Sequence, residues 1–428
     1  MGDYFVCSKT DPVVETKAGK VRGFRLNTTY AFHGIHYAEA DRFQMPQPVK
    51  PWKGIKNALA YGYVCPLLKQ DEPNMEVLVP HRYWPQDEHC QNLNVWTQSL
   101  DPGAKKPVMV WLHGGGFSAG SAIEHVAYEG DHLSEFGDVV VVSVNHRLNI
   151  LGYLDLSPFG EKYKNSANAG NADMVAALQW VHDNIAAFGG DPENVTIFGQ
   201  SGGGAKVLGL MSTPYAVGLF HKGIVESGVT ETVGVNFTSQ EASTRLAENL
   251  LAELNIAPEN IEQLQIVAVD KLQSAATKAL DATAQEFQIP APLTDGYQME
   301  WEPVVDGDFL PTSPVTETNF ADAGQDIPLL IGSNLNEWTG FYRTSTDGVD
   351  TDALSAALKT AYPDKTDLTA DHVDTLIRLP ILKTMSHKAD QNGAPVYAYL
   401  LTYGSSNHGA EIPYIFRHSD VSAMNDLF

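Results

Sequence analysis

Short apolar segments recur along the chain and alternate with polar turns and helix-like patterns. The clearest of them read as strands and lie at residues 107–113 (PVMVWLH), 138–145 (DVVVVSVN), 195–199 (VTIFG), 222–227 (KGIVES), 327–333 (IPLLIGS) and 395–402 (PVYAYLLT). Strands that are apolar on both faces and rich in Val and Ile are typical of a parallel sheet covered on two sides. The pattern therefore predicts a mostly parallel central sheet flanked by helices.

An amphipathic helix is predicted between two of these segments. Apolar residues recur there at three- and four-residue spacing, at Met174, Ala177, Leu178, Val181, Ile185 and Phe188. The turn-forming residues 189–192 (GGDP) end the pattern just before the strand at 195–199. A strand, a helix and a strand at this spacing form a βαβ unit, which indicates α/β architecture.

Two regions depart from this alternation. Residues 1–95 are rich in turns with short extended pieces, as expected of an antiparallel lead-in and its loops. Residues 239–290 are mostly helical, and one helix face is marked by Leu246, Leu250, Leu251 and Leu254. Insertions of this kind between sheet strands often cover a pocket. We therefore predict a single domain over residues 1–428 with a helical cap insertion at 236–290.

Charge and hydropathy exclude several classes of partner. Lys and Arg number 28 against 52 Asp and Glu, which gives a formal net charge of −24. A field of this sign repels phosphate backbones and anionic lipid, so nucleic acid and membrane surfaces are disfavoured. No run of about 18 apolar residues occurs, so the sequence predicts no membrane span. With 43% apolar and 19% charged residues, the composition is that of a globular protein.

The strongest chemical signal is a G-x-S-x-G motif formed by Gly199, Ser201 and Gly203, directly after the strand VTIF. A serine on a tight strand-to-helix turn needs glycine on both sides, because larger side chains would clash with the neighbouring strand and helix. The helix that follows points its amino-terminal amides towards the serine, which favours a developing negative charge. The motif makes Ser201 a candidate nucleophile, whereas no phosphate-loop pattern surrounds it.

A second glycine-rich turn, 111–117 (WLHGGGF), follows another apolar strand. A triple glycine lets backbone amides turn inward and approach a ligand closely. HGGG segments of this kind contribute to an oxyanion hole together with the amide of the residue after the nucleophile. We therefore expect Gly115, Gly116 and Gly202 to supply the amide donors.

A serine nucleophile needs a general base, and the sequence holds 14 histidines. In α/β-hydrolases the acid and then the histidine follow the serine along the chain. His408 lies in a loop after the strand at 395–402 and meets this requirement, whereas His418 lacks a preceding strand. By default we expect six other histidines to be structural: His33, His36, His113, His146, His387 and His418.

The acid that orients the histidine should end the strand before it. Glu337 follows the strand at 327–333 and fits this position. Three aspartates precede that strand and fit less well: Asp306, Asp322 and Asp326. We therefore expect a triad of Ser201, Glu337 and His408.

Several ordered segments give the chain a family resemblance. They are residues 34–46, 87–96, 144–154, 171–204, 327–337 and 408–416. In these segments the sequence resembles the type-B carboxylesterase and cholinesterase-like family of α/β-hydrolases. The resemblance implies the α/β-hydrolase fold, the same three triad residues and the same three oxyanion donors.

The chain also departs from the family pattern. Gln200 stands next to Ser201 where the family usually has Glu, which should alter the electrostatic field beside the serine. Gly202 replaces the usual Ala, which keeps the amide but loosens the backbone, and His89 stands where an acidic residue is usual. The spacing between Glu337 and His408 is shorter than is typical for the family, and fewer residues than usual follow His408. The chain is therefore expected to be either a compact variant or truncated.

The leading hypothesis is a serine hydrolase that cleaves small-molecule carboxylic esters through an acyl-enzyme intermediate. One alternative is a catalytically silent, cholinesterase-like binding or adhesion module, because fold alone does not determine function. A second alternative is the same mechanism acting on carbamates, lactones or amides. No cofactor is expected, and the cluster at 87–90 (DEHC) has no recurring metal-ligand spacing.

The cysteines are Cys7, Cys65 and Cys90. The resemblance implies a disulfide between Cys65 and Cys90, whereas two reduced thiols are expected if the protein is cytosolic. The first residues lack a basic start followed by an apolar core, which favours a cytoplasmic location. A mature or recombinant start would look the same, and the protein would then be secreted.

Overall fold

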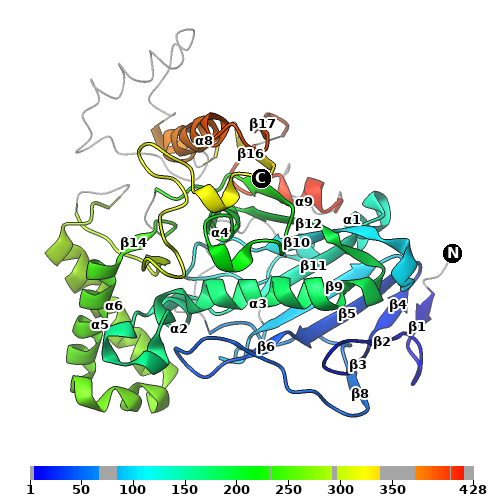
Figure 1. The fold of residues 1–428 in the computed structure, drawn as a ribbon, viewed down its shortest axis with the longest axis horizontal. Helices are drawn as coiled ribbons and strands as arrows, with labels where there is room; N and C mark the ends of the chain where they lie inside the picture. Colours follow the sequence, from blue (N-terminus) through cyan, green and yellow to red (C-terminus); the bar gives the residue numbers. More distant parts are fainter. Residues whose placement is uncertain are drawn as a thin grey trace, which may run out of the picture.

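The computed structural model describes residues 4–66, 84–231, 234–291, 296–337, 372–404 and 406–418. Within these residues the largest element is a ten-stranded sheet with the order β1-β4-β5-β9-β11-β10-β12-β13-β16-β17 (Figure 1). Its strands are β1 (Phe5–Val6), β4 (Phe24–Leu26), β5 (Thr29–His36), β9 (Asn92–Thr97), β11 (Val140–Asn145), β10 (Lys106–Leu112), β12 (Gly190–Gln200), β13 (Lys222–Glu226), β16 (Leu329–Asn334) and β17 (Val396–Leu401).

The half of the sheet from β11 to β17 is parallel throughout. All six apolar segments singled out in the sequence form these six parallel strands, so the predicted central sheet is confirmed. The four strands from β1 to β9 pair antiparallel, which confirms the predicted lead-in. Every residue of β11 is buried, as expected of a strand with helices on both faces.

Helices cover both faces of the sheet (Figure 1). They are α1 (Asp131–Gly137), α2 (Asn149–Tyr153), α3 (Ala169–Asn184), α4 (Gly202–Leu210), α8 (His372–Asp390) and α9 (Ile412–Ile415). Alternate residues of β10 belong to different buried clusters. The cluster of Val110 includes residues of α3, α4 and α8, whereas the cluster of Trp111 includes residues of α1 and α9. The predicted amphipathic helix is α3, and its turn of 3-10 helix, Ile185–Phe188, extends it as far as the sequence pattern indicated.

The region predicted to be helical contains α5 (Gln240–Leu254), a 3-10 segment (Pro258–Ile266) and α6 (Val269–Phe287). The side chain of Ser239 accepts a hydrogen bond from the amide of Ala242 and so begins α5. The predicted apolar face of α5 is buried against α6 and against residues of α2. The two long helices stand side by side at one end of the molecule (Figure 1).

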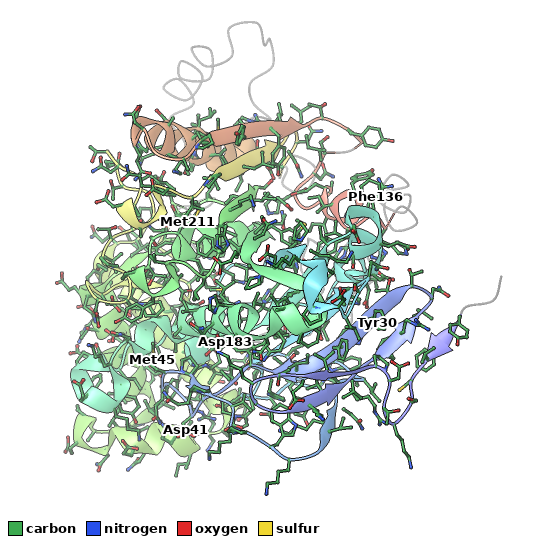
Figure 2. All side chains as sticks on the ribbon, turned by 45° about the vertical axis from the view of Figure 1, so that its right-hand side comes forward. Tyr30, Asp41, Met45, Phe136, Asp183 and Met211 are labelled. Atoms are coloured by element: carbon green, nitrogen blue, oxygen red, sulfur yellow. The ribbon has the colours of Figure 1, made fainter. Side chains whose placement is uncertain are left out.

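Smaller β elements lie outside the main sheet. They are a three-stranded sheet of β2 (Val13–Glu15), β3 (Lys20–Arg22) and β8 (Ile55–Asn57), and the pairs β6 (Ala38–Glu39) with β7 (Gln47–Pro48) and β14 (Thr238–Ser239) with β15 (Val304–Val305). Side chains fill the space between the sheet and its helices, with Met211 inside and Phe136 at the surface (Figure 2). In the part of the chain that the structure describes, no helix is long and apolar enough to cross a membrane.

Cys65 and Cys90 are buried next to each other as free thiols. Burial raises the pKa of Cys90 well above its ordinary value, and a hydrogen bond with Cys65 adds to the effect. Cys65 also accepts a hydrogen bond from the amide of Leu148 at 3.3 Å. Of the two alternatives for this pair, the structure therefore contains the reduced one.

Candidate active site

The candidate residues gather at the carboxyl edge of the parallel sheet. Strand β12 ends at Gln200, and the amide of Ser201 donates a hydrogen bond to the carbonyl of Glu226 at the end of β13 (2.8 Å). The amide of Ser227 then donates to the carbonyl of Gly332 in β16 (2.8 Å). Open α/β sheets bind their ligands at this edge, because the carboxyl ends of the strands meet there.

Ser201 lies on a strained turn between β12 and α4. Its φ of 57° and ψ of −124° are unusual for a residue with a side chain. The flanking glycines make this turn possible by close packing. A Cβ atom on Gly203 would lie 2.0 Å from the carbonyl oxygen of Leu112, and one on Gly199 would lie 2.6 Å from the backbone of Gly203. The structure therefore gives the physical reason for the G-x-S-x-G motif.

The glycine turn, residues Gly114–Gly116, follows β10 and faces the same helix start. Gly115 and Gly116 have φ values of 82° and 59°, a region that favours glycine. A Cβ atom on Gly202 would lie 2.3 Å from the amide nitrogen of Gly116. Gly202 thus allows the turn to approach α4 more closely than alanine would, a role that the sequence alone did not indicate. The structure brings all three predicted oxyanion glycines together.

His408 and Glu337 form a buried pair on two neighbouring loops. The Nδ1 atom of His408 lies 2.7 Å from Oε2 of Glu337, and the side chains are 1% and 0% exposed. The other carboxylate oxygen of Glu337 accepts a hydrogen bond from the amide of Asn334 (2.7 Å). The amide of His408 donates to the carbonyl of Glu337 (2.7 Å), so backbone and side chain both hold the two loops together.

The other sequence candidates lie elsewhere. His418 contacts the carbonyl of Glu129 through Nε2 (2.9 Å) and stacks on His132. The carboxylate of Asp306 accepts a hydrogen bond from the amide of Leu310. Asp322 begins a 3-10 turn, Asp322–Gly324. None of these contacts involves Ser201 or the His408–Glu337 pair.

Two further carboxyl groups are buried behind the pair. Burial raises the pKa of Glu411 to about 7, and the charge of Glu337 adds to the effect. Burial also raises the pKa of Glu226 well above its ordinary value, with Glu411 as a second cause. The side-chain amide of Asn334 donates to Glu411. Sequence reasoning missed both acids, although Glu411 follows His408 by three residues and Glu226 ends the strand β13.

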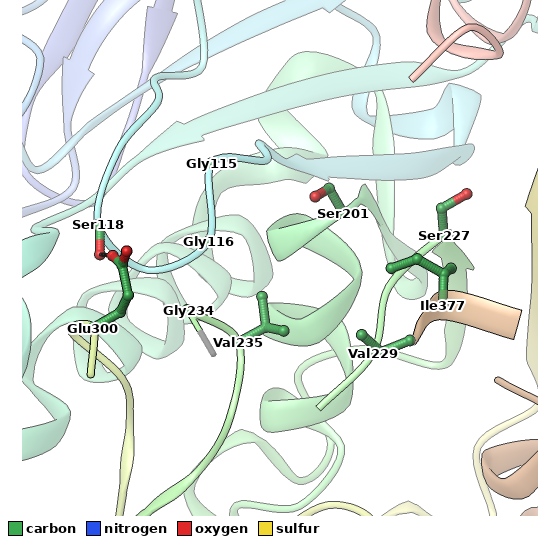
Figure 3. A pocket seen from close by; sticks show the side chains of 10 residues that line it. All are labelled: Gly115, Gly116, Ser118, Ser201, Ser227, Val229, Gly234, Val235, Glu300 and Ile377. Carbon is green, nitrogen blue, oxygen red and sulfur yellow. Dashed lines mark hydrogen bonds between the residues drawn. The ribbon is translucent and has the colours of Figure 1, made fainter. Parts of the chain in front are cut away.

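A cavity of about 260 Å³ opens beside Ser201 (Figure 3). At the serine end it is lined by Ser227 and by three apolar side chains, Val229, Val235 and Ile377. Figure 3 shows the glycine turn in the middle of the cavity and Ser118 with Glu300 at the opposite end. Ser118 donates a hydrogen bond to the carboxylate of Glu300 (3.2 Å). The cavity therefore has an apolar end near the serine and a polar end.

The segments at the two ends of the helical insertion line this cavity. Gly234 and Val235 precede the insertion, and Glu300 follows it. The carboxyl group of Glu302 joins the two segments, because it accepts hydrogen bonds from the amide of Gly234 (2.8 Å) and the hydroxyl of Thr238 (2.6 Å). Burial raises the pKa of Glu302 to about 7. Among the described lining residues, none belongs to α5 or α6.

Sheet order, the turn at Ser201 and the glycine turn together define an α/β-hydrolase. The model of the Carboxylesterase family matches residues 10–369. The chain therefore belongs to the carboxylesterase family, and it is a carboxylic ester hydrolase.

Individual relatives agree with this assignment. The chain is 34% identical to para-nitrobenzyl esterase of Bacillus subtilis (strain 168), over 96% of this chain and 84% of that protein. It is 35% identical to human carboxylesterase 3 over 77% of this chain and 55% of that protein.

Solved structures show the same fold. An esterase from Clostridium hathewayi, described as able to hydrolyse aliphatic aromatic polyesters, superposes with a TM-score of 0.84 at 43% identity and covers 99% of this chain and 86% of its own. A structure described as PNB esterase superposes with a TM-score of 0.78 at 32% identity, over 97% of this chain and 85% of its own.

Proposed function

We propose that the chain hydrolyses esters through an acyl-enzyme formed on Ser201, with His408 as general base and Glu337 as the acid that orients it. The observation that carries this proposal is the buried 2.7 Å contact between His408 and Glu337 on loops beside the Ser201 turn. A carboxylate on Nδ1 keeps the proton on that nitrogen, which leaves Nε2 able to accept the proton of the serine hydroxyl.

In the first half of the reaction, Ser201 Oγ attacks the ester carbonyl carbon while His408 takes the hydroxyl proton. The carbonyl oxygen becomes an oxyanion, and the amides of Gly115, Gly116 and Gly202 are proposed to bind it. The tetrahedral intermediate collapses, the carbon–oxygen bond to the alcohol breaks, and His408 returns the proton to the departing alcohol. Water then attacks the acyl-enzyme by the same route and releases the acid.

The residue pattern also argues against a catalytically silent binding module. A binding protein does not require a strained serine, a buried His–Glu pair and a glycine turn at one sheet edge.

The described residues hold no cluster of three or more His, Cys, Asp or Glu placed for a metal. We further propose that the insertion at 236–290 serves as a cap, since the segments that precede and follow it line the cavity and Glu302 ties them together.

Hydrolysis of p-nitrophenyl esters from acetate to decanoate tests the proposal directly. We expect activity that is highest for short and medium acyl chains, because the cavity is small and apolar beside Ser201. A fluorophosphonate should label the protein once, and peptide mass spectrometry should locate the label on Ser201. A folded protein that neither hydrolyses the esters nor takes the label would contradict the proposed function and favour a binding module.

The charge of Glu300 should select among esters. It is the one charged side chain among the described residues that line the cavity. A carboxylate on the substrate lies within a Debye length of it and is repelled. We expect Glu300→Gln to raise kcat/KM for p-nitrophenyl hemisuccinate, relative to p-nitrophenyl butyrate, by roughly 3- to 10-fold.

Glu193→Gln provides the matched control for this measurement. Glu193 is an exposed acid at the other end of β12, so its removal changes the net charge without changing the cavity. The ratio of the two esters should stay as in the wild type. An equal shift in both variants would show that overall charge, and not Glu300, selects the substrate.

A further inference from the structure

A lysine is buried directly behind the glycine turn. Lys206 lies on α4, five residues after Ser201, and is 0% exposed. Its ammonium group donates a hydrogen bond to the carbonyl oxygen of His113 at 2.8 Å. Among the described lysines only Lys206 and Lys388 are fully buried. Burying an ammonium group is costly unless specific contacts compensate, so the position calls for a reason.

The contact joins the two parts of the proposed oxyanion hole. His113 is the last residue before the glycine turn, which would supply the amides of Gly115 and Gly116. Lys206 belongs to the helix whose first residue, Gly202, would supply the third amide. Glycine-rich backbone is permissive and does not hold its own geometry. A tie between the turn and the helix is therefore needed to keep the amides aimed at one point.

Two buried histidine rings lie within electrostatic reach of Lys206. The rings of His113 and His146 stack with centroids 5.1 Å apart. Burial lowers the pKa of both well below the ordinary value, and Lys206 adds to each effect. Both imidazoles are thus neutral at pH 7. Next to the serine stands Gln200, whose side chain carries no charge.

We propose that Lys206 is a positioning residue for ester hydrolysis, which ties the glycine turn to α4 and places a positive charge behind the oxyanion hole. Its effect reaches the reaction through the amides, which bind charge that develops only in the transition state. Removing it should therefore lower kcat and leave KM nearly unchanged. This inference rests on the proposed function of Ser201 and the oxyanion hole.

Lys206→Met tests the proposal, because methionine keeps the apolar stem and removes the ammonium group. We expect kcat for p-nitrophenyl butyrate to fall roughly 10- to 100-fold, with KM within about twofold, since a misplaced donor loses most of its effect. Hydrogen-exchange mass spectrometry on the intact protein should show faster exchange in the peptide that covers 113–119. An unchanged kcat together with unchanged exchange would overturn the proposal.

Two further variants separate positioning from a general loss of stability. Lys388→Met removes the other buried lysine, whose ammonium group donates to the carbonyl of Gln325 (2.6 Å) far along the chain. Lys388→Met should lower the stability of the protein and leave kcat at the wild-type value. If Lys388→Met lowered kcat as much as Lys206→Met does, Lys206 would have only a structural role. Lys206→Gln retains a hydrogen-bond donor, so its kcat should be higher than that of Lys206→Met. If it were not, the proposal that Lys206 ties the glycine turn to α4 would be wrong.

The proposed function can fail separately from this inference. Activity retained in Ser201→Ala would contradict the nucleophile and leave the proposed function without support. The rate of hydrogen exchange in the 113–119 peptide of Lys206→Met would still decide whether Lys206 holds the glycine turn, since that measurement does not depend on catalysis.

Discussion

Ser201→Ala is expected to lower kcat for p-nitrophenyl butyrate by about 10⁴- to 10⁶-fold. Without the hydroxyl no acyl-enzyme can form, and only the oxyanion donors and substrate binding remain to accelerate attack by water. The structure supports a clean substitution, because the strained φ of 57° belongs to the backbone of residue 201 and the alanine variant adopts it at the same cost. Initial rates, together with loss of fluorophosphonate labelling, measure the effect.

Ser227→Ala is the matched comparison. Ser227 lines the same cavity and also has a positive φ of 51°, but it ends a strand without the glycine-flanked turn. We expect its replacement to cost less than about tenfold in kcat, because it is not paired with a candidate base. If the two substitutions had the same effect, the assignment of the nucleophile to Ser201 would be wrong. Circular dichroism of both variants checks that each is folded.

Much of the fold could be predicted because the central parallel strands, such as β11, are buried on both faces, whereas β17 at the edge of the sheet is partly exposed. Their sequences are continuous apolar runs, and β11 contains only one polar residue, Ser143, before its final Asn145. The first and last residues of the strands were harder to predict. β12 begins at Gly190, before the expected start at 195, because Gly190 pairs with Lys106 ahead of an irregularity between Lys106 and Val108. A pattern of apolar residues cannot detect such an extension.

The residues of the candidate site could be predicted from the sequence wherever a local constraint leaves a recognisable motif. Gly203 needs to be glycine because of a backbone contact with Leu112, and that need leaves a motif that can be read. Contacts between distant segments leave no such motif. Ser118 and Glu300 meet across 182 positions, and a lysine such as Lys206 is expected at the surface from its residue type alone.

Glu337→Gln is expected to lower kcat by about 10⁴-fold, the loss seen when an equivalent triad acid becomes an amide. The amide of Asn334 donates to Oε1 of Glu337, so this position must stay an oxygen in the variant. The new NH₂ group then faces Nδ1 of His408, which must accept its hydrogen bond and lose its own proton. The remaining proton moves to Nε2, where it prevents the imidazole from accepting the proton of Ser201.

Glu411→Gln distinguishes this tautomer effect from a general change in buried charge. Glu411 is buried beside Glu337, and its pKa of about 7 means that it is partly protonated at neutral pH. Glutamine resembles the protonated form and can still accept the hydrogen bond from the side chain of Asn334. Its kcat should therefore stay within about tenfold of the wild type. A loss in Glu411→Gln as large as in Glu337→Gln would mean that the acid of the triad had been misassigned, because both changes remove one carboxylate but only Glu337 contacts His408 Nδ1.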